Sequence, residues 1–182
     1  GKSFKGWKIR KGEEQWWRIR EGAIIGGSLE KPVPHNTFIT TVKRYRNFEL
    51  RLKVKLEGGK KANAGIQIRS ERLPDHHEMI GYQADMGDGW WGCLYDESRR
   101  CKVLAGPPKK ERDKIVKQGS WNDYRILCKD RRIQLWINGQ KTVDYTEEDK
   151  SIPQKGLIGL QIHSGPAAEA WYKDIKIKIL PK

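Results

Sequence analysis

Polar side chains able to bind a sugar or move its protons recur on one face of three predicted strands. Residues 64–70, 80–86 and 157–163 alternate apolar and polar side chains, which predicts strands with one buried face each. The alternation leaves six polar groups on the other face: Gln67, Arg69, Gln83, Asp85, Gln161 and His163. Amide, guanidinium and carboxylate groups pair with sugar hydroxyls, and carboxyl and imidazole groups also act as general acids and bases.

A fourth predicted strand, residues 133–137, adds an aromatic ring to this pattern. Its apolar positions indicate a buried face, which leaves Trp136 on the opposite face together with Gln134 and Asn138. A flat indole can stack on the C–H face of a sugar ring. We therefore expect the four strands to form one concave, carbohydrate-binding sheet. This expectation depends on register, because a slip of one residue would exchange the two faces of a strand.

The segment between residues 87 and 118 is rich in glycine, tryptophan and charge, and we expect it to be a long loop. It holds a further set of candidate residues: Trp90, Trp91, Asp96, Glu97, Arg99 and Arg100. Asp96 or Glu97 could serve as a general base, with an arginine to hold an oxyanion. The same acids and arginines could equally form a salt-bridge cluster that pins the loop, and the sequence leaves both alternatives open.

The histidines form no metal-binding motif. His76 and His77 lie between two acids, but neighbouring residues on a strand or loop point apart, and His35 falls in a proline-rich turn. A divalent cation held by Asp85 and His163 is the remaining alternative, and the sequence does not identify the metal.

The three cysteines also form no metal motif. Cys128 alternates with apolar neighbours, so we expect it to be a small residue of the core. Cys93 and Cys101 bracket a loop and could form a disulfide in an oxidising compartment.

The chain of 182 residues carries a net charge of +14, from 37 lysines and arginines against 23 acids. These basic residues are spread along the sequence and many occupy alternate strand positions, as in residues 47–56. This spread favours a well-solvated basic surface over a nucleic-acid partner, whose binding sites cluster their basic residues. No apolar run approaches the ~18 residues that a membrane-spanning helix needs.

The element pattern predicts an all-β protein. Residues 118–145 contain two alternating runs, a charged turn and then Asn138-Gly139, which is a strong hairpin signal and indicates an antiparallel meander. About ten to twelve short strands are expected, with brief helices only near residues 109–116 and 147–150. We therefore expect residues 1–182 to form a single antiparallel β-sandwich or jelly roll, because strands do not alternate with helices.

Several segments together resemble the 3-keto-disaccharide hydrolase domain family, which has a concanavalin A-like sandwich. They occur in the family's order and span nearly the whole chain. The matching segments are F-K-G-W-K (4–8), W-R-I-R-E-G-A-I-I-G-G (17–27), N-F-E-L-R-L-K-V-K-L (47–56), N-A-G-I-Q-I-R-S (63–70), G-Y-Q-A-D-M-G-D-G-W-W-G-C-L-Y-D-E-S-R-R (81–100), S-W-N-D-Y-R-I (120–126), L-W-I-N-G-Q-K-T-V-D-Y (135–145) and I-G-L-Q-I-H-S-G (158–165).

The resemblance implies an enzyme that cleaves glycosides oxidised at C3 and that is exported, to the periplasm or beyond. It also implies a pocket containing Arg69, Gln83, Asp85 and His163. A ketone at C3 acidifies the C2 hydrogen, so a base can form an enolate that expels the C1 group by β-elimination, and water then adds. A non-catalytic carbohydrate-binding module of a larger secreted protein is the alternative.

Roles for individual residues follow from this chemistry. Asp85 or Glu97 is expected as the base, and His163 as an acid or ligand. Arg69 or a divalent cation is expected at the oxyanion, and Trp91 or Trp136 as the stacking platform. The remaining expected substrate contacts are Gln67, Gln83, Trp90, Asp96, Arg99 and Gln161.

Overall fold

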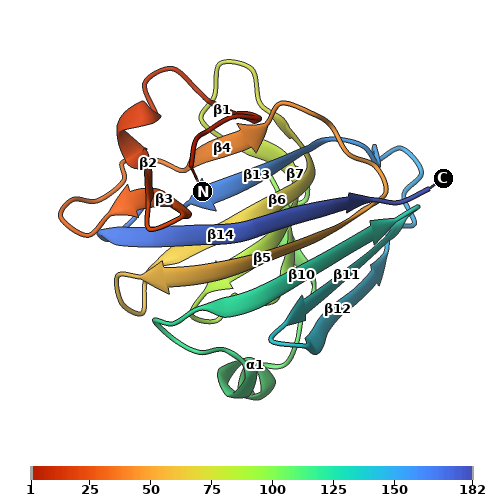
Figure 1. The fold of residues 1–182 in the computed structure, drawn as a ribbon. Helices are drawn as coiled ribbons and strands as arrows, with labels where there is room; N and C mark the ends of the chain where they lie inside the picture. Colours follow the sequence, from red (N-terminus) through yellow and green to blue (C-terminus); the bar gives the residue numbers. More distant parts are fainter. Residues whose placement is uncertain (1, 182) are drawn as a thin grey trace.

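A computed structural model describes residues 2–181 as two antiparallel sheets of seven strands each. Sheet A contains, in spatial order, β1 (Trp7–Ile9), β4 (Thr37–Thr41), β13 (Leu157–Ile162), β6 (Asn63–Arg72), β7 (Met79–Gly87), β8 (Leu94–Glu97) and β9 (Lys102–Ala105). Sheet B contains β12 (Gln140–Thr146), β11 (Arg132–Ile137), β10 (Asn122–Lys129), β5 (Phe48–Glu57), β14 (Ala168–Ile179), β3 (Ala23–Ser28) and β2 (Trp17–Arg20). Figure 1 shows β14, β5, β10, β11 and β12 side by side in one layer, with β13, β6 and β7 behind them. The predicted sandwich is confirmed.

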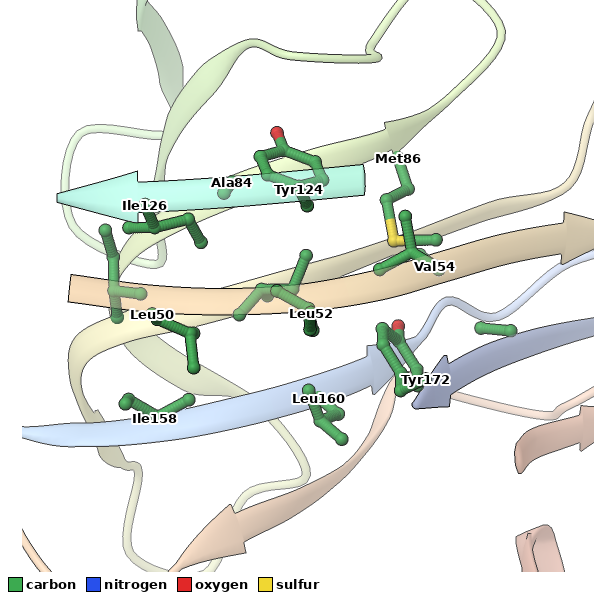
Figure 2. Close-up of a cluster of buried hydrophobic side chains, with 14 of the residues drawn as sticks. Leu50, Leu52, Val54, Ala84, Met86, Tyr124, Ile126, Ile158, Leu160 and Tyr172 are labelled. Carbon is green, nitrogen blue, oxygen red and sulfur yellow. The ribbon is translucent and has the colours of Figure 1, made fainter. Parts of the chain in front are cut away.

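The core lies between the two sheets. Period-two alternation buries one face of each strand, so that Leu50, Leu52 and Val54 of β5 meet residues of the opposite sheet such as Ile158 and Leu160. Figure 2 shows these side chains interleaved between the strands. Truncating a fully buried leucine of this kind to alanine typically costs about 2–5 kcal/mol.

The meander β10–β11–β12 is confirmed in position and direction. Asn138 and Gly139 both adopt positive φ angles, 49° and 84°, as the tight turn between β11 and β12 requires. The Asn138 side chain also donates to the carbonyl of Ile115 at 2.6 Å, and Ile115 is the last residue of the helix α1 (Lys109–Ile115). The turn therefore fixes the end of α1, which lies at one end of the sandwich (Figure 1).

Residues 87–118 are more ordered than the expected long loop. They form β8, β9 and α1, and β1 is a further strand that the sequence pattern did not indicate. The strand β8 escapes detection because Asp96, a charged residue, occupies one of its two buried positions. Residues 147–150 are not helical, whereas the helix expected near residues 109–116 is present. No helix in residues 2–181 is both long enough and apolar enough to cross a membrane.

The outer face of sheet B carries the lysines and arginines of β5 and β14, as expected for the solvated sheet. Three of the four strands expected in the polar sheet, β13, β6 and β7, are direct neighbours in sheet A. The expectation that the fourth strand, β11, joins this sheet is wrong. Strand β11 belongs to sheet B, because the meander pairs through β10 with β5.

The three cysteines are free thiols. Cys128 is fully buried in the core, as predicted. Cys93 is buried and its sulfur accepts a hydrogen bond from Arg112 at 3.1 Å, while Cys101 is exposed.

Candidate active site

A small cavity of about 150 Å³ opens on the outer face of sheet A. Strands β6, β7 and β8 contribute its floor and one wall, and the segments that follow β3, β7 and β13 contribute its rim. The lining residues are Asn36, Asn63, Gln83, Asp85, Trp90, Tyr95, Glu97 and His163. The cavity therefore combines two carboxyl groups, one imidazole, three amides and two aromatic rings.

The floor of the cavity depends on a glycine. Gly65 of β6 pairs with Asp85 of β7 on one side and with Gln161 of β13 on the other. A Cβ atom at Gly65 would lie 2.6 Å from Cδ of Gln83, so a larger residue would displace that side chain. Glycine at this position lets Gln83 lie flat across β6.

A directional chain of hydrogen bonds crosses the floor. The Ser70 hydroxyl donates to the Gln67 oxygen at 2.7 Å, and the Gln67 nitrogen donates to the Gln83 oxygen at 2.8 Å. The Gln83 nitrogen is thereby directed at Oδ1 of Asp85, 2.7 Å away. The chain fixes which end of each amide faces which neighbour, and it leaves Oδ2 of Asp85 for another partner.

Two tyrosines from sheet B support this floor from the core side. The Tyr124 hydroxyl donates to the Asp85 carbonyl oxygen at 3.2 Å. The Tyr172 hydroxyl lies within hydrogen-bonding distance of the carbonyl oxygens of Gly65 and Gln161. Both rings are almost completely buried, so the backbone under the site is tied to the opposite sheet.

The two carboxyl groups of the cavity have raised pKa values for the same main reason. Burial raises the pKa of Asp85, which is 2% exposed, well above its usual range, and the Gln83 hydrogen bond offsets only part of this rise. Burial also raises the pKa of Glu97 to about 7, and the negative charges of Glu78 and Asp96 add to the effect. Near neutral pH Glu97 therefore exchanges its proton readily, and burial favours the protonated form of Asp85.

The rim provides an aromatic surface and an oriented imidazole. Trp90 is 41% exposed and meets Tyr95 edge to face, with ring centroids 6.0 Å apart. Nδ1 of His163 lies 2.6 Å from the Ser164 carbonyl oxygen. Because a carbonyl can only accept, Nδ1 carries a proton, and Nε2 is the nitrogen left to exchange protons or bind a ligand.

Asn36 joins the rim to its neighbours. Its nitrogen donates to Oε1 of Glu78 at 2.8 Å, and its oxygen accepts from the backbone nitrogen of Ser164 at 2.8 Å. The sequence pattern did not single out Asn36, Asn63 or Tyr95. Tyr95 could have been found, since it lies two residues before Glu97 and so shares its face of β8.

The structure brings together Asp85, Glu97, His163, Gln83 and Trp90, which the sequence had indicated separately. Gln67 and Gln161 lie on the same face of sheet A beside the cavity. Gln161 is fully buried, and its amide has no hydrogen-bond partner within residues 2–181.

The prediction that Arg69 lies in the pocket is wrong, because its side chain does not face the cavity. A β-bulge between Ile68 and Glu71 interrupts the alternation of β6, and Arg69 adopts a positive φ of 51° there. Its guanidinium group instead donates to the carbonyl of Arg46, at 2.7 and 2.9 Å, and to the side chain of Gln154. It is 3% exposed and ties together segments at the edge of the sandwich.

The predictions that Asp96 and Arg99 contact the substrate are also wrong. Asp96 points to the buried face of β8, opposite to Glu97, and forms ion pairs with Arg99 at 2.7 Å and with Arg100. Arg100 bridges further to Glu147 at 2.6 Å. For Asp96 and Arg99 the alternative of a structural salt-bridge cluster is therefore the one that the structure favours.

Two tryptophans lie elsewhere. Trp91 is 3% exposed and belongs to the core, and Trp136 is on the outer face of sheet B. Neither of the two expected stacking platforms lines the cavity, whereas Trp90, predicted as a further substrate contact, does.

A metal ion was an open alternative at Asp85 and His163. Carboxylate, imidazole and amide groups line the cavity, but residues 2–181 contain no group of three or more His, Cys, Asp or Glu side chains placed to hold a metal. The side chains as arranged therefore do not fit a metal site.

Comparison with known protein families matches residues 1–178 to the 3-keto-alpha-glucoside-1,2-lyase-like domain. The chain belongs to this family. The match confirms the resemblance that the sequence segments indicated, and the chain is a carbohydrate-active domain of the 3-keto-glucoside lyase-like family. No curated protein matches the sequence.

Solved structures support the fold. A candidate glycosyl hydrolase from Parabacteroides distasonis ATCC 8503 is 22% identical, with a TM-score of 0.72 over 100% of this chain and 92% of that one. The carbohydrate-binding module CBM66 from Bacillus subtilis is 14% identical, with a TM-score of 0.71 over 95% of each chain. A legume lectin-like domain from Entamoeba histolytica is 12% identical, with a TM-score of 0.60 over 97% and 91%. At these identities the similarity establishes the concanavalin A-like sandwich alone.

Proposed function

We propose that this domain is an enzyme that cleaves glycosides oxidised at C3, by proton abstraction at C2 followed by β-elimination. The observation that carries the proposal is the pair of carboxyl groups that line one cavity, both with pKa values raised by burial, Glu97 to about 7 and Asp85 well above its usual range. Elimination next to a ketone needs such a pair, since one group removes a proton while the other donates a hydrogen bond to the developing enolate.

Glu97 is the base. A general base is most effective when its pKa lies near the working pH, and the pKa of Glu97 is about 7. Its carboxylate takes the C2 proton, and the electrons of the C2–H bond form the C2–C3 double bond of an enolate. The negative charge then resides on the C3 oxygen.

Asp85 stabilises that oxygen. A carboxylic acid that its surroundings keep neutral can donate to an enolate oxygen. Oδ1 of Asp85 accepts from Gln83, so the proton is available on Oδ2. No arginine or lysine lines the cavity among residues 2–181, which gives Asp85 this role in place of Arg69.

The enolate then expels the group bonded to C1. Its electrons return to the C3 carbonyl, a C1–C2 double bond forms, and the departing oxygen takes a proton. His163 is the acid for this oxygen. In its imidazolium form both ring nitrogens carry a proton, so Nδ1–H stays on the Ser164 carbonyl while Nε2 donates its proton to the departing oxygen. Water adds to C1 and a proton returns to C2, so the net reaction is hydrolysis. The exposed face of Trp90 stacks on the sugar ring.

The test measures product release from a 3-keto-glucoside and from the same glucoside before oxidation. Cleavage of the keto sugar alone is expected, and Glu97→Gln should reduce kcat by about 100-fold or more, since one general base contributes roughly 10²–10⁴-fold. Glu148→Gln, at an exposed acid outside the cavity, is the matched control. Equal cleavage of both sugars, or full activity in Glu97→Gln, would refute the assignment.

A non-catalytic carbohydrate-binding module is the second candidate. The similarity in fold to a carbohydrate-binding module over 95% of both chains favours it. In that case the wild type should not cleave the sugar at all. Trp90→Ala should abolish sugar binding, while Glu97→Gln should bind the sugar as tightly as the wild type. Calorimetric titration of the two variants with keto and parent sugars separates the candidates.

A further inference from the structure

Basic side chains that are dispersed in the sequence converge on the outer face of sheet B. The register of the strands aligns five residues directly across five neighbouring strands. In spatial order this cationic row consists of Lys141 (β12), Trp136 (β11), Arg125 (β10), Arg51 (β5) and Lys176 (β14). With a strand spacing of about 4.8 Å, the row extends over roughly 19 Å.

A groove of about 560 Å³ is lined by four of the five residues of this row, all except Lys141. Its lining includes four basic side chains, Arg51, Lys53, Arg125 and Lys176, against two acids, Asp123 and Asp174. Asp123 pairs with Lys53 at 2.8 Å, so these two opposite charges offset each other. The groove is therefore positively charged, on the face of the molecule opposite to the cavity of sheet A.

The row places like charges next to each other. Arg125 is directly opposite Arg51, and Arg51 is directly opposite Lys176. Like charges at directly opposite positions destabilise a sheet. Glu49 relieves part of the repulsion by pairing with both arginines, and Lys141 pairs with Asp144 at 2.9 Å, but Lys176 has no ion-pair partner within residues 2–181. An anionic ligand would offset the repulsion that remains.

Stacking on tryptophan fixes some of these cations in place. The Arg125 guanidinium lies 4.2 Å from the centre of the Trp136 ring. On the same outer face, Lys55 lies 4.2 Å from the ring centre of Trp171, and Lys173 lies 4.0 Å from that of Trp121. A cation held over an aromatic ring loses less conformational freedom when it binds an anion.

We propose that the groove binds a linear acidic polysaccharide, such as a chain of uronic acids, whose repeated carboxylates pair with the cationic row. A straight row of cations fits an extended polymer better than a compact anion. Nucleic acid fits less well, because single-strand binding uses exposed rings for base stacking and Arg125 covers Trp136. Bound in this way, the polymer would hold the domain while the cavity on sheet A stays open.

The experiment titrates the protein with oligogalacturonate and with its methyl ester, by calorimetry at two salt concentrations. The two ligands share their sugar rings and differ in charge, so the proposal predicts binding of the free acid, weaker binding at higher salt, and at least tenfold weaker binding of the ester. The test variant combines Arg51→Gln with Lys176→Gln. The control combines Lys60→Gln with Lys61→Gln, which remove the same charge from an exposed turn.

Binding of the free acid that drops tenfold or more in the test variant, and that survives in the control, supports the proposal. Equal binding of acid and ester, or equal loss in both variants, would overturn it. Tighter binding of single-stranded DNA, lost in the test variant, would also overturn it and make the groove a nucleic-acid site. Turnover of keto sugars is measured in the same variants and should not change, so this result is independent of the proposed enzyme activity.

Discussion

Replacing Glu97 by glutamine should make the protein more stable at alkaline pH while it removes the base. The pKa of Glu97 is about 7 in the folded chain, against 4.5 for an unperturbed glutamic acid. Because one pKa unit corresponds to about 1.4 kcal/mol, ionising this buried group costs up to ~3 kcal/mol of folding free energy. The side chain is only partly buried, and solvent screening reduces the expected effect to ~1–2 kcal/mol.

The sign follows from proton linkage. The folded chain binds the Glu97 proton more tightly than the unfolded chain, so this group lowers stability as pH rises from about 4.5 to about 7. Below this window Glu97→Gln and the wild type should be nearly equal, since both side chains are neutral. Above it the variant should unfold at a higher temperature, by ~2–8 °C for a domain of this size.

Thermal unfolding followed by tryptophan fluorescence at pH 4.5, 6 and 8 measures the effect. Glu148→Gln is the control, because it changes the same charge at an exposed position. The quantity of interest is the difference between the two variants as a function of pH. A Glu97→Gln variant that is no more stable than the control at pH 8, or whose advantage is the same at every pH, would show that the burial argument is wrong.

Further predictions concern activity and the floor of the site. The value of kcat/KM for a keto sugar should rise as the pH approaches 7, because Glu97 acts as a base only when it is ionised; a pH–rate profile checks this. Trp90→Ala should raise KM several-fold with little change in unfolding temperature, since the ring is exposed. Gly65→Ala should lower kcat, because the new methyl group displaces Gln83, and the measurement compares kcat with the Tm of the same variant. Arg69→Ala should destabilise the fold by roughly 2–4 kcal/mol through loss of buried hydrogen bonds, as denaturant titration would show.

Alternation in the sequence predicted much of the site. Gln83, Asp85 and Gln161 face outward from sheet A because their strands keep a strict period of two, and that period depends only on local geometry. Alternation therefore predicted the outward face of Asp85, whereas its place in one pocket with His163 came from the family resemblance.

The errors have two physical causes. Arg69 turns away because a bulge inserts an extra residue into β6, and a bulge with a non-glycine residue leaves no clear sequence signal. Trp136 was assigned to the wrong sheet because alternation predicts which face a residue occupies but not which strands become neighbours. The choice between Asp96 and Glu97 also depends on the pairing of β8 with β7, which is a long-range property.

The tyrosines beneath the site divide the molecule into a fixed part and an adaptable part. Tyr124 and Tyr172 attach the backbone under Asp85 and Gly65 to the far sheet, so any change that shifts this floor must also repack the interior. The rim residues Trp90 and His163 lie outside the strands and carry no such attachment. A laboratory search for variants with new leaving groups should therefore succeed when it randomises the rim segments, and yield mostly unfolded protein when it randomises the floor.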